Sequence, residues 1–159
     1  MIRVGVLTVS TLGAAGKRQD ASGDAIAAWA VGRGYQVALR DLVPDDTAAI
    51  ARRLMEWSDG GAVDLVLTTG GTGLTPTDRT PEATRAVLER EAPGIAEYLR
   101  ASSWTAFPRA ALARGTAGVR GGTLIVNLPG SPSGVADYLA ALERVVEHAV
   151  DLVRGKGEH

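Results

Sequence analysis

Cysteine is absent from this chain of 159 residues, and its absence excludes disulfide bonds, thiolate metal sites and a cysteine nucleophile. Histidine is nearly absent, because only His148 and His159 are present. A Ser-His-Asp triad, a histidine metal site and general acid–base catalysis by histidine are therefore not expected. The polar groups that remain available for chemistry are carboxylates, hydroxyls and backbone amides.

The chain also lacks a long apolar run and an excess of basic residues. No apolar stretch approaches the roughly 20 residues that cross a bilayer, and residues 1–6 enter a strand at once, which leaves no room for a signal peptide. Lysine and arginine total 17, aspartate and glutamate total 18, and the formal net charge is −1. The composition thus predicts a cytoplasmic protein that binds neither membranes nor nucleic acid, with any anion site built locally.

Strand-like and helix-like segments alternate along the sequence, which has 45% hydrophobic and 22% charged residues. Apolar β-branched runs predict strands, and apolar residues at i, i+3 and i+4 predict amphipathic helices. The pair Gly121-Gly122 between two apolar runs predicts a β-hairpin. The expected strands are 4–9, 35–43, 64–67, 114–120 and 123–128, and the expected helices are 22–31, 47–57, 81–91, 95–101 and 135–153.

This alternation indicates a single three-layer α/β domain: a mostly parallel sheet with helices on both faces and an antiparallel hairpin near one edge. No linker or internal repeat interrupts the pattern. We expect the domain to span residues 1–153 and the polar residues 154–159 to form a flexible tail. Because ligands of such sheets bind outside the carboxyl ends of the strands, the loops that follow the strands carry the candidate site.

The segment Thr68-Thr-Gly-Gly-Thr-Gly-Leu-Thr-Pro-Thr-Asp78 is the most informative of these loops. It leads into a helix with Thr80 as expected N-cap and Pro81 as first helical residue. Its backbone N–H groups and hydroxyls suit phosphate binding. Asp78 would repel a phosphate unless a divalent cation, most readily Mg²⁺, lay between them. The alternative is a tight turn in which Asp78 is solvated or caps the helix.

Three further loops follow expected strands, at 10–23, 42–46 and 127–134. The first is not a Walker A motif, because Thr11 and Arg18 stand where that pattern needs glycine and Ser or Thr. Its Lys17-Arg18 pair would supply positive charge near an anion or lie in solvent. The last loop has two prolines that would fix exposed backbone donors suited to a planar heterocycle, although a plain turn is the alternative.

Carboxylates accompany these loops at positions 20, 45, 46 and 78. Carboxylates beside phosphate-binding loops, without a histidine or cysteine nucleophile, indicate metal-assisted phosphoryl or nucleotidyl transfer. Such chemistry depends on positioning and on charge neutralisation more than on covalent participation by the protein.

Several motifs, in this order, resemble the MogA/MoaB family of molybdenum cofactor biosynthesis proteins. They are Gln19-Asp20 with Ser22-Gly23, Thr68-Thr-Gly-Gly-Thr-Gly73 followed by Asp78-Arg-Thr-Pro-Glu-Ala-Thr84, and Asn127-Leu-Pro-Gly-Ser-Pro132. Length and order of elements agree over nearly the whole chain. The sequence departs from the family pattern at Thr11, Ala14 and Ala15, where many members carry an acid, an amide or further hydroxyls.

The resemblance implies a molybdopterin-binding domain that, in catalytic members, transfers AMP from ATP to molybdopterin and releases pyrophosphate with Mg²⁺. It assigns catalysis and Mg²⁺ binding to Asp45 and Asp78; the choice of Asp45 over Asp46 rests on the family's Pro-Asp pattern. The expected sites for molybdopterin and nucleotide are Ser10, Asp20, Ser22, Gly23, Thr69, Gly70, Gly71, Thr72, Gly73, Asn127, Pro129, Gly130, Ser131 and Pro132.

The resemblance also implies a homotrimer and a hand-over of product to a molybdenum-insertion protein. Trp104 and Phe107 lie in a segment with little periodicity and would supply a contact surface, or pack on the chain's own core. Two other functions fit the same loops. The protein could be a family member that binds molybdopterin without catalysis, or it could be a related nucleotide pyrophosphatase. Relatives of the latter type normally carry an extra domain.

Overall fold

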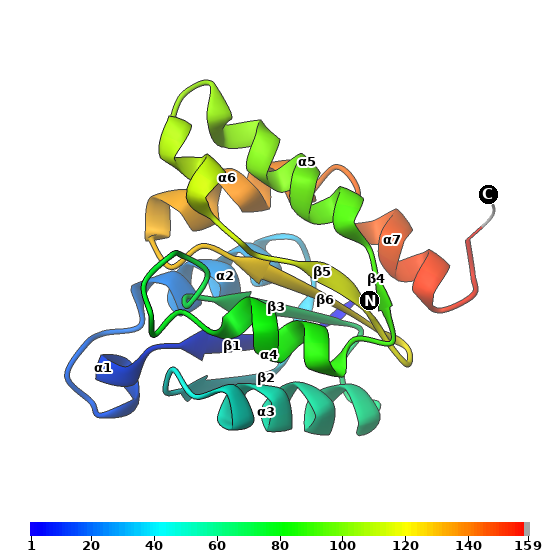
Figure 1. The fold of residues 1–159 in the computed structure, drawn as a ribbon. Coiled ribbons are helices and arrows are strands. Elements are labelled where there is room, and N and C mark those ends of the chain that lie inside the picture. The colour runs from blue at the N-terminus through cyan, green and yellow to red at the C-terminus, as the bar shows by residue number, and fades with distance from the viewer. Residues whose placement is uncertain (158–159) are drawn as a thin grey trace.

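A single sheet of six strands lies at the centre of the computed structural model, which describes residues 1–157 (Figure 1). The strand order is β2-β1-β3-β6-β5-β4. The strands are β1 (Arg3–Val9), β2 (Gln36–Val43), β3 (Leu65–Thr69), β4 (Arg90–Glu91), β5 (Ala117–Arg120) and β6 (Thr123–Leu128). The first four strands in this order are parallel, and β5 is antiparallel to both of its neighbours. The predicted mostly parallel sheet with an antiparallel hairpin is confirmed.

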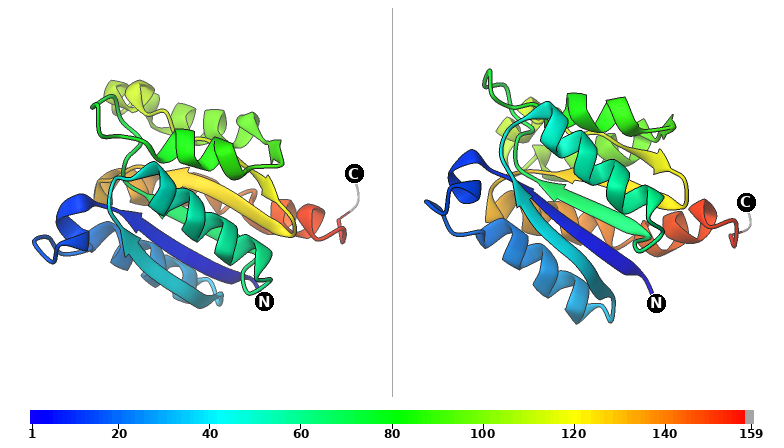
Figure 2. Two further views of the ribbon diagram at one scale, coloured as in Figure 1. Left: turned by 60° about the horizontal axis from the view of Figure 1, so that its bottom comes forward. Right: turned by 90° about the horizontal axis from the view of Figure 1, so that it is seen from below.

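Helices cover both faces of the sheet (Figure 2). They are α1 (Thr11–Ala14), α2 (Ala21–Gly32), α3 (Thr47–Asp59), α4 (Thr80–Val87), α5 (Pro93–Trp104), α6 (Pro132–Leu142) and α7 (Val146–Val153), with a 3₁₀ helix η1 at Pro108–Leu112. Alternate strand residues face opposite cores. Leu65 and Leu67 pack with α2, α5, α6 and α7, whereas Val66 packs with α3 and α4. This arrangement is the predicted three-layer fold.

The helix expected at 81–91 is shorter than predicted and ends at Val87. Leu88 adopts an extended conformation, after which Glu89 and Ala92 donate backbone hydrogen bonds to β5. Pairing with the sheet edge therefore replaces further helical turns. The expected N-cap is also wrong, because the Thr80 hydroxyl donates to the Gly70 carbonyl instead of accepting from the first turn.

The helix expected at 135–153 is divided into α6 and α7. Between them, Arg144 and Val145 donate to carbonyls three residues back, which tightens and ends the first helix. Val146 and Val150 remain buried beyond the break. Apolar residues at helical spacing indicate which side chains are buried, but they do not show whether one helix or two carry them. The break between α6 and α7 could therefore not be predicted from this spacing.

The remaining differences are small. The segment expected to be a helix at 95–101 extends over all of α5, and the first loop contains the short helix α1. Arg154, the first residue of the expected tail, bonds to Asp64 of the domain, whereas residues 158–159, including His159, lie outside the described residues. Across the part of the chain that the structure describes, no helix combines the length and apolar character that a bilayer span requires.

Candidate functional site

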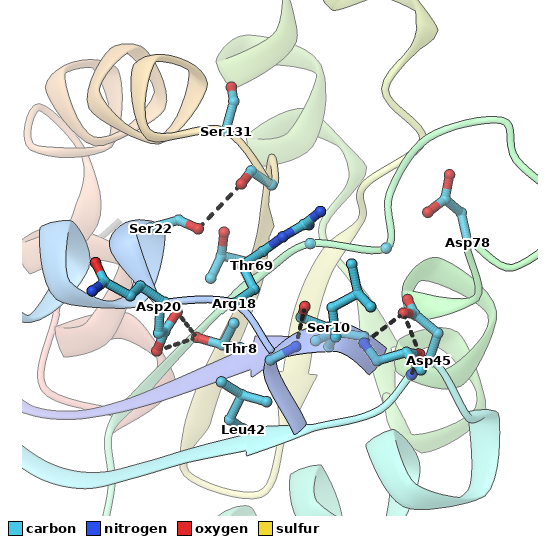
Figure 3. Close-up of a pocket in the computed structure, with 18 residues that line it drawn as sticks. Thr8, Ser10, Arg18, Asp20, Ser22, Leu42, Asp45, Thr69, Asp78 and Ser131 are labelled. Atoms are coloured by element: carbon cyan, nitrogen blue, oxygen red, sulfur yellow. Dashed lines mark hydrogen bonds between the residues drawn. The ribbon is translucent and has the colours of Figure 1, made fainter. Parts of the chain in front are cut away.

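A cavity of about 450 Å³ opens at the carboxyl edge of the sheet (Figure 3). The loops that follow β1, β2, β3 and β6 all contribute to its lining, as the strand order predicts. The predicted site residues that line it are Ser10, Asp20, Ser22, Asp45, Thr69, Gly70, Gly71, Asp78, Gly130 and Ser131. The cavity thus gathers residues from loops that lie far apart in the sequence.

Close backbone approach explains the glycines of the Gly/Thr loop. Gly70 and Gly71 have φ values of 96° and 69°, which side chains rarely adopt. A Cβ atom on Gly70 would lie 2.3 Å from the carbonyl oxygen of Val9. The Thr69 hydroxyl donates to the Pro129 carbonyl at 2.5 Å, which joins this loop to the one after β6. The loop backbone therefore lines the cavity without intervening side chains.

Asp45 faces the cavity from the loop after β2. Its Oδ2 accepts hydrogen bonds from the backbone N–H and the hydroxyl of Thr11, at 3.1 and 2.9 Å. The neighbouring Asp46 has a different task, because its carboxylate caps α3 by accepting from the Ala49 N–H. The structure therefore separates the two acids that sequence patterns alone left equivalent, and it gives Thr11 a function in holding Asp45.

Asp78 faces the same cavity from the loop after β3. Its Oδ2 accepts from the Thr75 N–H at 3.0 Å. Gly71 and Gly73 lie against the two acids, since Cβ atoms there would be 3.3 Å from Asp45 Oδ1 and 2.8 Å from Asp78 Oδ2. One glycine loop thus runs between both carboxylates. Within residues 1–157, neither carboxylate forms a salt bridge with lysine or arginine.

Two carboxylates without a salt bridge, beside a phosphate-binding backbone, fit a magnesium ion. Mg²⁺ prefers oxygen ligands, and it commonly binds through one or two carboxylates and takes its other ligands from water and substrate phosphates. No group of three or more His, Cys, Asp or Glu side chains that could hold a metal occurs among the described residues. Any ion at Asp45 and Asp78 would therefore take its other ligands from water or substrate phosphates.

Asp20 is the third acid of the cavity, and unlike Asp45 and Asp78 it forms a salt bridge, with an arginine that it shares with Asp24. It caps α2 by accepting from the Gly23 N–H, accepts the Thr8 hydroxyl at 2.9 Å and forms a salt bridge with Arg40 at 3.0 Å. A Cβ on Gly23 would collide with this carboxylate. Figure 3 shows Asp20 and Ser22 toward one end of the cavity and Asp45 and Asp78 toward the other. Asp20 therefore braces the first loop, and the two carboxylates without a salt bridge lie at the opposite end.

The loop after β6 closes the end of the cavity that contains Asp20. The Ser22 hydroxyl donates to the Gly130 carbonyl at 3.1 Å, which joins the first loop to the last. Ser131 caps α6 by accepting from the Gly134 N–H, and Pro132 is the first residue of that helix. These contacts fit both alternatives for this loop, a ligand-binding loop and a turn that leads into α6.

Six predicted site residues do not line the cavity: Gly23, Thr72, Gly73, Asn127, Pro129 and Pro132. The most instructive is Asn127, which is only 3% exposed. Its Nδ2 donates to the hydroxyls of Thr68 and Thr84, and its Oδ1 accepts from the Thr116 N–H. The side chain thus bonds inside the protein, where it joins β6 to β3, to α4 and to the residue that precedes β5.

Arg18 lines the cavity, and it is the one lysine or arginine among the described lining residues. Its side chain extends between the two ends of the cavity in Figure 3. The adjacent Lys17 does not line the cavity. Of this pair, only Arg18 is therefore placed to supply positive charge to an anion in the cavity. Leu12 and Leu42 add apolar surface that sequence reasoning missed, because single apolar residues in loops give no signal of their own.

Comparisons with known proteins identify one group of similar sequences. The profile of a family described as "probable molybdopterin binding domain" matches residues 5–148. The chain is 37% identical over 165 residues to a molybdopterin adenylyltransferase of Helicobacter pylori strain J99, in a match that covers 97% of this chain and 89% of that protein. It is 39% identical to the molybdenum cofactor synthesis protein cinnamon of Drosophila melanogaster, but 96% of this chain spans only 26% of that longer protein.

Solved structures give the same result. The crystal structure of the molybdopterin biosynthesis enzyme MoaB from Thermus thermophilus matches with a TM-score of 0.93 and 52% identity, over 99% of both chains. At that TM-score and coverage the two chains share one fold along their whole length.

Proposed function

Because the chain belongs to the MogA/MoaB family of molybdenum cofactor biosynthesis proteins, we propose that its carboxyl-edge cavity is the active site of a molybdopterin adenylyltransferase. The reaction transfers AMP from ATP to the terminal phosphate of molybdopterin and releases pyrophosphate. The observation that carries the proposal is the pair Asp45 and Asp78, carboxylates from two loops that both line the cavity and lie against one glycine loop.

In the reaction, an oxygen of the terminal phosphate of molybdopterin forms a bond to the α-phosphorus of ATP. The bond from that phosphorus to the oxygen bridging to the β-phosphorus breaks, and pyrophosphate leaves with the electron pair. The attacking phosphate is already anionic, so the step needs no base from the protein. This agrees with the lining of the cavity, which includes no histidine among the described residues. The protein accelerates the step by holding both substrates in reach of each other.

Each part of the cavity has a place in this scheme. Asp45 and Asp78 would hold Mg²⁺, which when bound neutralises phosphate charge and polarises the α-phosphoryl group. The N–H groups of Gly70 and Gly71 would stabilise the charge on the phosphate oxygens. Arg18 would add the protein's own positive charge. The end closed by Ser22 and Gly130 would accept the pterin, because a hydrogen bond joins its two loops and its acid is held in a salt bridge with Arg40.

The test of the proposal is incubation of purified protein with molybdopterin, ATP and Mg²⁺. Formation of adenylyl-molybdopterin and pyrophosphate is expected. A member that only binds molybdopterin would give neither product, and a nucleotide pyrophosphatase would release nucleoside monophosphate without adenylyl-molybdopterin; both outcomes contradict the proposal.

ATP binding is expected to depend on Mg²⁺ and on Asp45. Without a cation, the carboxylates would repel the triphosphate by about a few kcal/mol in a partly desolvated cleft. Calorimetric titration of ATP should therefore show binding with Mg²⁺ and none with chelator, and Asp45→Asn should lose it while molybdopterin binding survives. Asp46→Asn is the matched control, because asparagine still caps α3. ATP binding that is insensitive to chelator would exclude this arrangement.

Arg18→Ala is expected to weaken pyrophosphate binding about tenfold, because it removes the cationic side chain from the lining of the cavity. Lys17→Ala serves as the control, since it removes the same charge from the adjacent position outside the lining. Both variants should be titrated with pyrophosphate at several salt concentrations. If both substitutions weaken pyrophosphate binding equally, Arg18 contributes only general surface charge and no specific contact in the cavity.

We also propose that residues 1–153 form the functional unit, that it assembles as a homotrimer and that it passes its product to a molybdenum-insertion protein. Trp104, Phe107 and Leu112 are 49%, 48% and 51% exposed on and between α5 and η1, so they do not pack fully on the chain's own core. Sedimentation at micromolar concentration should give the mass of three chains, and replacing Trp104 and Phe107 by serine should give a monomer. A monomeric wild-type protein would exclude the assembly.

A further inference from the structure

Arg114 lies outside the cavity and makes an unusual number of bonds to one of its loops. Its backbone N–H donates to the Thr72 carbonyl at 2.8 Å. Its Nε donates to the Gly73 carbonyl at 2.8 Å, and Nη2 donates to the Asp78 carbonyl at 3.0 Å. The two side-chain bonds reach the beginning and the end of the segment from Gly73 to Asp78. One guanidinium therefore contacts both ends of this loop without lining the cavity.

We propose that Arg114 is a positioning residue for nucleotidyl transfer, which holds the 73–78 loop so that the Asp78 carboxylate remains turned into the cavity. The role in catalysis rests on the proposed function, whereas the role in fixing the loop stands on the contacts alone. Arg114 itself touches no substrate in this scheme, because it does not line the cavity. It acts through Asp78.

The loop needs such support because it has little packing of its own. Residues 74–77 are all exposed, with Leu74 64% exposed. Inside the loop, the Asp78 N–H donates to the Thr75 carbonyl and the Asp78 carboxylate accepts from the Thr75 N–H, each at 3.0 Å. These bonds fix the carboxylate relative to its own loop. The bonds from Arg114 fix the loop relative to the rest of the domain.

Glu82 anchors Arg114 to a rigid element. Its carboxylate accepts from Nη1 at 2.6 Å and from Nη2 at 3.2 Å, a two-pronged contact to the first turn of α4. The hydrogen bond from Arg114 holds the pKa of Glu82 below its ordinary value, so the pair is charged at neutral pH. Ala83 and Val87 bury the opposite side of α4 in the core. The guanidinium thus connects a packed helix to an exposed loop.

A lysine cannot reproduce this connection, because a single ammonium group lacks the planar fork that reaches two carbonyls and a carboxylate together. Arg114→Lys retains the charge and removes the geometry. We expect kcat to fall about tenfold or more, in line with the cost of misplacing a catalytic group. The KM for molybdopterin should change less than about twofold, and the Mg²⁺ concentration for half-maximal ATP binding should rise.

The decisive measurement is hydrogen–deuterium exchange of the 72–79 segment in the free protein, which needs neither substrate nor activity. Exchange in this segment should be faster in Arg114→Lys, while the strands exchange as in the wild type. Arg120→Lys is the matched control, because Arg120 binds Asp59 and the Val87 carbonyl away from the cavity. Glu82→Gln provides a second variant with a smaller change in the same direction, should Arg114→Lys fail to fold.

The outcomes separate the two claims. Unchanged exchange at 72–79 in Arg114→Lys would overturn the positioning role, whether or not the wild-type protein is active. Faster exchange with wild-type kcat would also overturn it, since the loop would then not limit catalysis. An inactive wild-type protein whose Arg114→Lys variant still shows faster exchange would leave the loop contact in place and remove the proposed function alone.

Discussion

Asp78→Asn is expected to lower the kcat for adenylyl-molybdopterin formation by about 100-fold, an effect of the size seen when metal placement is disturbed. The KM for molybdopterin should change little. Asparagine keeps the shape of the side chain, and its carbonyl oxygen can still accept from the Thr75 N–H. The substitution therefore removes the charge and leaves the loop in place. A fall in kcat at constant KM is the signature of a group that acts mainly in the transition state.

The measurement is steady-state kinetics at saturating Mg²⁺, with Asp46→Asn as the control for the loss of one negative charge near the same edge of the sheet. Asp46 caps α3 and should leave kcat near the wild-type value. A kcat within about twofold of wild type in Asp78→Asn would remove Asp78 from the catalytic machinery. A large rise in KM with unchanged kcat would instead assign the residue to ground-state binding.

Much of the site could be predicted because parallel strands all end at one edge of the sheet. Once the alternation of strands and helices indicates such a sheet, the loops after successive strands must lie together. Asp45 and Asp78, which follow different strands, meet at the cavity for this reason. Glycines that need positive φ, such as Gly70 and Gly71, also appear in the sequence as a local signal.

The contacts that escaped prediction join residues distant in sequence. Asn127 was expected to bind ligand, yet its amide is consumed by Thr68, Thr84 and Thr116, and no local pattern reveals that set of partners. Arg114 carries no motif at all, and its importance appears only when its bonds to the 73–78 loop are seen. The spacing of apolar and polar residues along the sequence indicates strands, turns and exposed faces. Buried polar contacts are set by tertiary packing, which this spacing does not show.

The second large expected effect is on the stability of the protein. It concerns Asp64, at the edge of the sheet opposite the cavity. Asp64 precedes β3, and its side chain is only 4% exposed. It accepts hydrogen bonds from the backbone and side chain of Arg3 and from the side chain of Arg154. These bonds tie the beginning of β1 and the residue after α7 to the centre of the sheet. Asp64→Asn leaves both arginines without their anion and should lower the free energy of unfolding by about 3 kcal/mol at pH 7.

The pH dependence of this loss follows from the pKa of Asp64. Burial alone would raise the pKa of this carboxyl, but the bonds from Arg3 and Arg154 outweigh burial and hold the pKa well below its usual range. A carboxyl whose pKa is lower in the folded state stabilises the protein fully above its unfolded pKa of about 4, and this contribution is lost as the pH falls toward the folded value. The stability gap between wild type and Asp64→Asn should therefore be constant from pH 7 to about 5 and narrow below about 4.

Urea unfolding of both proteins across this pH range measures the gap directly. Asp59→Asn is the control, because Asp59 also binds an arginine, Arg120, but does so at a 60% exposed position where solvent screens the pair. Its unfolding midpoint should match that of the wild type throughout. A gap for Asp64→Asn that persists unchanged below about pH 4 would show that the carboxyl stabilises the fold by its shape and hydrogen bonds. In that case its negative charge would not be what joins the two ends of the domain to β3.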